Sequence, residues 1–245
     1  MGFDDYNFNN DQNDGIPADF NDDTTRKNFT KKVLALVGLQ LTMTFGAVTS
    51  VAIVENAKPM GETLAGKGLF TPELLWFSIV MTFVLLFGAT CCCSSILRKA
   101  PHNFGFLFLF TVFESHLIST VGLRYDIGAI GSAMGATAGV VLIVAALVAF
   151  TNFDFTKLLP IMFAVLLSWI LVVIITRLMG VQWDRTLYCC IGVTIFTIFL
   201  AIDLKLVLGG GKYQYTEDDY VLASLNIYLD ILNIFLYILQ MFGDN

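Results

Sequence analysis

Charged side chains are scarce in this sequence. They make up 14% of the 245 residues, whereas 56% are hydrophobic and the mean hydropathy is +0.74. An average globular protein is about 25% charged and about 45–50% apolar. Acidic residues outnumber basic ones, 20 to 14, and no basic patch is present, which argues against a nucleic-acid-binding protein. The composition indicates an integral membrane protein.

Cysteine is also uncommon, and its placement argues against two further classes. The five cysteines form two groups, Cys91–Cys93 and Cys189–Cys190, in or beside apolar segments. Neither the spacing of a disulfide framework nor that of a zinc site is present. Cys91–Cys93 lie near an expected membrane boundary, so both palmitoylation and simple packing stay open as interpretations.

Basic residues are missing from the start of the chain. The first 23 residues contain seven Asp and no Lys or Arg, with many Asn and few aliphatic side chains. We predict a disordered, acidic, cytosolic tail over residues 1–25, followed by one transmembrane domain over residues 26–245. A basic region followed directly by an apolar core is absent there, so we expect no signal peptide.

Long apolar runs fill the remainder of the chain. A helix needs about 20 apolar residues to cross about 30 Å of hydrocarbon. Prolines and the Gly209–Gly211 turn separate the runs, as is usual at helix ends. We predict an all-α fold, a polytopic membrane protein formed by a seven-transmembrane-helix bundle. The expected spans are residues 33–54, 73–97, 103–123, 127–150, 158–179, 186–208 and 220–242.

The distribution of Lys and Arg predicts the orientation. Nine basic residues fall on the side of the N-terminus and five on the opposite side, so we expect a cytosolic N-terminus. The first group is Arg26, Lys27, Lys31, Lys32, Arg98, Lys99, Lys157, Lys205 and Lys212, and the second is Lys58, Lys67, Arg124, Arg177 and Arg185.

Small residues repeat in the fourth expected span. Gly131, Gly135 and Gly139 are four residues apart and therefore share one helical face. Such faces allow helices in lipid to approach closely. We expect this face to be a packing surface rather than part of a pore.

Three acidic residues interrupt the expected spans: Glu114, Asp203 and Asp230. A charge at the centre of a bilayer costs roughly 3 kcal/mol, so each carboxyl should be solvated, paired or protonated. Asp203 lies about 9 Å before the Gly209 end of its helix, and Asp230 about 15 Å after the start of the next helix at Tyr220. Because a short turn joins the two helices, we expect the two carboxyls to lie at a similar depth and to form a pair.

The last expected span has one polar face. Its polar residues are spaced four, three, four and three apart, and its other faces are Ile, Leu and Phe, so we expect this helix to be central. On the sixth span, Gly192, Phe196, Phe199 and Asp203 share a face. A cation or proton site explains two converging acids best; structural hydrogen bonding between helices is the alternative. For Glu114 the two interpretations are equally open. The polar residues of the last span are Asn226, Asp230, Asn233, Tyr237 and Gln240.

Several motifs resemble those of a known family. They are "LNIYLDILN" in the last span, "RKNFTKKVLALVGLQLTMT" at the first, the cysteine-rich end of the second, and "FTNFDFTK" between the fourth and fifth. Over residues 25–243 the chain resembles the Bax inhibitor-1 family of transmembrane Bax-inhibitor-motif proteins, and within it the Lifeguard branch.

The resemblance implies a fold and a function. The last helix should be central, wrapped by the other six, in the endoplasmic reticulum or another internal membrane, with the Golgi and plasma membrane as alternatives. The implied activity is a pH-sensitive calcium leak that protects against cell death, without enzymatic activity and without a cofactor other than calcium as the permeant or bound ion. Asp203 and Asp230 correspond to the family's proton-sensitive latch, and Arg98, or else Lys99, to the basic residue that engages it. Lys205 departs from the family pattern near Asp203.

A mechanism follows as a hypothesis. Two adjacent carboxyls in a dry site share a proton, and their deprotonated form would hold calcium transiently, with oxygen ligands from Asn226 or Asn233. The expected partners are membrane lipid, calcium, protons, and apoptosis regulators or channels, but no nucleic acid. A non-conducting scaffold that inhibits apoptosis through protein contacts is the alternative. An intramembrane aspartyl protease is disfavoured, because Asp203 follows Ala201 and Ile202 rather than a Gly-x-Gly sequence.

Overall fold

The computed structural model describes residues 23–57, 64–65, 67–88, 101–180, 183–209, 211–213 and 215–243. Within these ranges all regular structure is helical, as predicted. The α-helices are α1 (Asp23–Asn56), α2 (Pro72–Phe87), α4 (His102–Gly122), α5 (Ile127–Phe150), α6 (Leu159–Leu178), α7 (Arg185–Leu208) and α8 (Tyr220–Phe242). Three short 3-10 helices accompany them: η2 (Gly68–Phe70), η4 (Phe155–Leu158) and η5 (Glu217–Asp219).

Each expected span corresponds to one of these helices. Six are long and apolar enough to cross a membrane, and α2, with 16 described residues, is a shorter apolar helix. The rest of the second expected span, with Cys91–Cys93 and Arg98, lies outside the described residues. The chain is therefore a multi-pass membrane protein. Its first helix begins at Asp23, about three turns before the apolar run that starts at residue 33.

Local chemistry sets the helix ends. Asp126 precedes α5, and its Oδ2 accepts hydrogen bonds from the backbone N–H groups of Gly128 and Ala129 at 2.9 and 3.1 Å. Asp184 precedes α7 and accepts from the N–H of Leu187 at 2.9 Å. These bonds satisfy N–H groups that a helix start otherwise leaves without a partner. Gly209 ends α7 with φ of 78°, which favours glycine.

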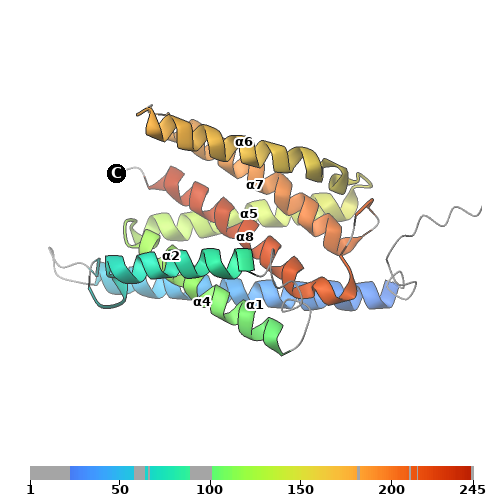
Figure 1. The fold of residues 1–245 in the computed structure, drawn as a ribbon, viewed down its shortest axis with the longest axis horizontal. Helices are drawn as coiled ribbons and strands as arrows, with labels where there is room; N and C mark the ends of the chain where they lie inside the picture. The colour runs from blue at the N-terminus through green and yellow to red at the C-terminus, as the bar shows by residue number, and fades with distance from the viewer. Residues whose placement is uncertain are drawn as a thin grey trace, which may run out of the picture.

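The C-terminal helix is the centre of the bundle. In its most apolar window 67% of the residues are buried, against 6% in α6. Helix α8 packs mainly against α1, α4, α5 and α7, while α2 packs against α4 and α6 against α7 (Figure 1). The predicted central position of α8 is confirmed. The expectation of six wrapping helices is refined, because α2 and α6 pack mainly on other helices and form an outer layer.

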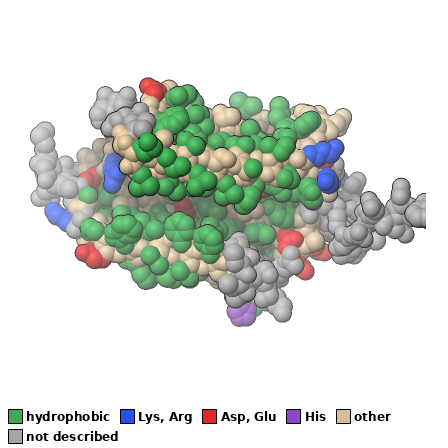
Figure 2. Space-filling view, turned by 45° about the horizontal axis from the view of Figure 1, so that its top comes forward, with side chains coloured by type: hydrophobic (Ala, Val, Ile, Leu, Met, Phe, Trp, Pro, Cys, Tyr) green, Lys and Arg blue, Asp and Glu red, His purple; other side chains and the backbone are tan. Residues whose placement is uncertain are grey.

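The outer surface suits a lipid environment. Figure 2 shows hydrophobic side chains along the length of the bundle, with charged side chains gathered toward its two ends. Large apolar residues are strongly exposed, among them Phe150 at 89% and Leu178 at 83%. A surface of this kind is covered by lipid tails rather than by water.

One packing expectation is wrong for the part of the chain that the structure describes. Gly131 and Gly135 of α5 are exposed, and a Cβ added at Gly131, Gly135 or Gly139 would have no described atom within 4 Å. The buried face of α5 instead carries residues such as Ala133 and Thr137. Ala133 and Thr137 have larger side chains than glycine and pack toward α7 and α8. The glycines therefore lie on the side of α5 that faces away from these two helices.

Candidate functional site

Asp203 and Asp230 lie on α7 and α8, which pack side by side. Each residue is 7% exposed. Their two side chains lie close enough to interact electrostatically. A carboxylate has no hydrogen to donate, so any hydrogen bond between these two groups requires at least one proton on the pair. The fold therefore buries both acidic side chains on two helices that pack against each other.

One carboxyl oxygen of Asp230 has no hydrogen-bond partner among the described residues. The Oδ2 atom of Asp230 is buried and receives no hydrogen bond from any N–H or hydroxyl group in the described part of the chain. A buried polar atom without a partner is costly, by about 1–3 kcal/mol. A shared proton, a water molecule or a cation would satisfy it.

Tyr215 adjoins the two aspartates from the turn between α7 and α8. It interacts electrostatically with Asp203 and Asp230, and its hydroxyl accepts a hydrogen bond from Asn226 Nδ2 at 2.9 Å. Burial raises the pKa of Tyr215 well above its usual range, so the phenol stays neutral and retains its O–H donor. Sequence reasoning did not single out Tyr215; the available signal was an aromatic residue in the turn that joins two acid-bearing helices.

The rest of the polar face of α8 has several partners. Asn233 donates to the carbonyl of Leu229 on its own helix at 2.8 Å. Tyr237 lies on Gly192 of α7, with its ring 5.9 Å from that of Phe196. Gly192 and Phe196, which were predicted to share one face of α7 with Asp203, therefore both pack against Tyr237 of α8. Gln240 lines a cavity at the end of the bundle.

Glu114 adjoins a different cluster. Thr44 of α1 hydrogen-bonds Ser115 of α4 at 2.8 Å and the hydroxyl of Tyr228 of α8 at 2.7 Å, all among buried residues. Half-buried Glu114 interacts electrostatically with Tyr228. Tyr228 lies two residues from Asp230, on another face of α8. The structure therefore associates Glu114 with a network that ties three helices together.

His116 has partners at both ring nitrogens. Nδ1 hydrogen-bonds Ser78 Oγ at 2.9 Å, and Nε2 hydrogen-bonds the carbonyl oxygen of Leu69 at 2.7 Å. The ring of Phe70 stacks on the ring of His116, with the ring centroids 5.8 Å apart. His116 thus packs α2 and η2 against α4. Within the described ranges, no group of three His, Cys, Asp or Glu residues is arranged to hold a metal ion.

A basic residue engages α7 near Asp203. Arg98 lies outside the described residues, but Arg26 of α1 donates from Nε to the carbonyl of Leu208 at 3.1 Å and from Nη2 to that of Leu206 at 3.2 Å. A guanidinium is favourable at a helix C-terminus, where carbonyl groups are free. A Cβ at Gly209 would overlap this guanidinium. Arg26 therefore fastens the start of α1 to the end of α7.

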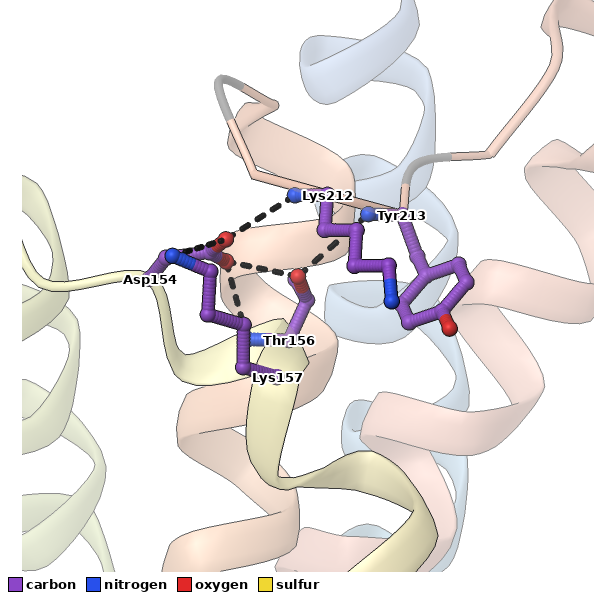
Figure 3. A network of polar contacts seen from close by, with 5 residues as sticks. All are labelled: Asp154, Thr156, Lys157, Lys212 and Tyr213. Carbon is purple, nitrogen blue, oxygen red and sulfur yellow. Dashed lines mark hydrogen bonds and ion pairs between the residues drawn. The ribbon is translucent and has the colours of Figure 1, made fainter. Parts of the chain in front are cut away.

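A second fastening holds the turn that carries Tyr215. Asp154, between α5 and α6, accepts hydrogen bonds from Thr156 Oγ1 at 2.6 Å and from the N–H of Lys212 at 3.0 Å (Figure 3). Thr156 Oγ1 accepts in turn from the N–H of Tyr213 at 3.3 Å. Lys157 lies 3.7 Å from Asp154 Oδ2. We call these contacts the Asp154 clasp.

The sequence matches known proteins over most of its length. Residues 26–245 match the family described as inhibitor of apoptosis-promoting Bax1. Protein lifeguard 3 of Homo sapiens is 30% identical over 232 residues, covering 93% of this chain and 72% of the relative. Golgi anti-apoptotic protein of vaccinia virus (strain Lister) is 29% identical over 220 residues, covering 88% of this chain and 85% of the relative. With its helical bundle and matching motifs, the chain belongs to the Bax inhibitor-1 family.

Proposed function

We propose that the protein protects against cell death from within an internal membrane, by a pH-sensitive calcium leak gated by Asp203 and Asp230. The regulation of cell death is supported by the relatives, whose names include an anti-apoptotic protein and whose family is described as an inhibitor of apoptosis. The gate is supported by the burial of both carboxyl groups on the packed helices α7 and α8, where the two groups interact electrostatically. This shared burial is the single observation that carries the proposal.

The proton is the switch in this proposal. With a proton held between them, Asp203 and Asp230 hydrogen-bond and tie α7 to α8. Loss of the proton leaves two negative charges in contact where little water screens them, and their repulsion favours separation of the two helices. The two acids titrate as one coupled unit, so the leak follows the protonation state of the pair.

The deprotonated pair also suits a passing cation. Calcium binds carboxylate and other oxygen atoms, and a stable site uses six to eight of them. Asp203 and Asp230, with the amide oxygen of Asn226 or Asn233, provide fewer. Calcium would therefore bind transiently, as conduction requires. No resident cofactor is needed for this mechanism.

A flux measurement in liposomes tests the gate. Purified protein is reconstituted with a calcium indicator, and the leak is recorded between acidic and alkaline pH. We expect the leak of the wild type to rise with pH, and the variants Asp203→Asn and Asp230→Asn each to lose this pH dependence. Asp218→Asn, at an exposed acid of the adjacent turn, is the matched control and should behave as wild type.

Two results would contradict the proposal. One is a leak and pH dependence that stay unchanged in both aspartate variants. The other is cell protection that persists in both variants with no flux from the purified wild type, which would favour the non-conducting scaffold. Cleavage of a model transmembrane substrate would instead favour the protease.

A further inference from the structure

A basic cavity lies at the end of the bundle away from the Asp154 clasp. Its volume is about 710 Å³. Its walls come from the turn between α4 and α5, the last turns of α6, the start of α7 and the end of α8. Cavities of this size hold molecules as large as drugs or headgroups.

Three arginines line this cavity. Arg124 follows α4, Arg177 lies in the last turn of α6, and Arg185 is the first residue of α7. They come from three separate segments, so their approach is a product of the fold and not of one basic run. Arg185 also donates from Nη1 to the carbonyl oxygen of Gly243 at 3.4 Å, so Arg124 and Arg177 carry the argument that follows.

The described acids closest in sequence to these arginines have other partners. Asp126 caps the start of α5 and Asp184 that of α7, each through backbone N–H groups. No acidic residue is part of the described cavity lining. The cavity therefore combines positive charge with hydrogen-bond donors.

The remaining wall is aromatic and apolar. Trp183, Tyr188 and Val173 line the cavity, and Tyr188 stacks on Trp169 with ring centroids 5.5 Å apart. Just outside it, Leu178 and Met179 are 83% and 74% exposed, at the end of a helix that faces lipid. Aromatic residues beside basic ones at a helix end are typical of the interface between lipid tails and water.

We propose that this cavity binds the phosphate group of an anionic molecule through Arg124 and Arg177, with Arg185 alongside. Arginine forks bind the oxygen atoms of a phosphate group in pairs, whether that group belongs to a lipid headgroup or to a soluble compound. The phosphate belongs either to a phospholipid of the surrounding leaflet or to a soluble compound. The proposal does not depend on the calcium leak.

Binding to the purified wild-type chain in detergent distinguishes the two sources. The probes are dioctanoyl phosphatidylglycerol, its zwitterionic counterpart dioctanoyl phosphatidylcholine, and inorganic phosphate, and bound molecules are detected by native mass spectrometry. Preferential binding of phosphatidylglycerol supports a lipid source. Displacement of this lipid by inorganic phosphate at comparable concentration, or binding of phosphate alone, supports a soluble source.

Variants locate the site. The double variant Arg124→Gln with Arg177→Gln should bind the preferred probe at least about tenfold more weakly, because both charge-assisted pairs of hydrogen bonds to the phosphate group are lost. Lys67→Gln removes an exposed cation outside the cavity and should bind as wild type. Arg177→Lys keeps the charge but not the fork, and should weaken binding less.

The proposal is overturned if the wild type shows no preference for phosphatidylglycerol over phosphatidylcholine and does not bind phosphate. It is overturned equally if a folded double variant, judged by its melting curve, binds as tightly as Lys67→Gln. The wild-type measurement decides the question even if the double variant does not fold.

Discussion

Gly192 of α7 leaves room for the ring of Tyr237 of α8. A Cβ at this position would overlap the ring. Tyr237 also packs against Tyr188, with ring centroids 5.5 Å apart, and against Phe196. The ring therefore has little freedom to move away. Because the side chain of Gly192 is a single hydrogen atom, α7 and α8 can approach each other closely at this position.

We expect Gly192→Ala to destabilise the protein by about 1–3 kcal/mol, the usual range for an overpacked core. Thermal unfolding in detergent measures the change. Gly135→Ala is the matched control, because a Cβ there meets no described atom and alanine favours helix. Gly135→Ala should melt at or above the wild-type temperature. Equal melting temperatures of the two variants would show that the contact between Gly192 and Tyr237 does not limit the side chain at position 192.

Some single-residue positions could be predicted from the sequence and others could not. Asp203 and Asp230 lie on consecutive helices joined by a short turn, so their proximity can be reasoned from connectivity, while their gating role stays a prediction. Arg26 contacts Leu208, 182 positions away in the chain. No periodicity within one helix indicates a partner at that distance. Tyr215 was missed for a related reason, because a turn residue has no helical face from which its direction can be inferred.

At the scale of elements, the Asp154 clasp joins the loop between α5 and α6 to the turn between α7 and α8. The hydroxyl of Thr156, above all, lowers the pKa of Asp154, and the N–H groups of Lys212 and Thr156 and the charge of Lys157 act in the same direction. The pKa in the folded state is thus below the value of about 3.9 for an unfolded chain. Asp154 therefore adds stability above about pH 4, and this contribution is lost as the pH falls through the folded pKa.

We expect Asp154→Asn to lower the melting temperature at pH 6 and to remove part of the loss of stability between pH 5 and pH 3. The asparagine amide cannot be protonated over this range, so the contribution of residue 154 to the free energy of unfolding no longer varies with pH. Melting curves of wild type and variant across this range measure the difference. Asp218→Asn, at an exposed acid, should reproduce the wild-type pH profile. A wild-type profile in Asp154→Asn would mean that the clasp does not stabilise the fold.

Helix faces were less predictable than helix lengths. Apolar length alone predicts the helices, because a membrane imposes a minimum span. The glycine face of α5 was assigned wrongly because small residues allow close packing without requiring it. The polar face of α8 was assigned to the bundle interior because burying polar side chains among partners is the alternative to exposing them to lipid. The helix with the highest buried share is the one that carries this face.

At the scale of the whole molecule, basic residues gather at both ends of the bundle, in unequal numbers. Arg26 touches the end of α7, and Lys157 and Lys212 belong to the Asp154 clasp, so the start of α1 and both of these loops share one end. Arg124, Arg177 and Arg185 surround the cavity at the other. Among described residues the first end carries more cations, which predicts that it faces the cytosol.

Glycosylation reporters test this orientation. An Asn-x-Thr acceptor inserted beside Lys67, at the predicted lumenal end, should be glycosylated when the protein is expressed in cells, because the modifying enzyme acts in the lumen of the endoplasmic reticulum. The same insertion beside Lys212 should stay unmodified. Digestion with a glycosidase and the shift on a gel measure the result. Modification beside Lys212 alone would reverse the orientation, and with it the side from which protons reach Asp203 and Asp230.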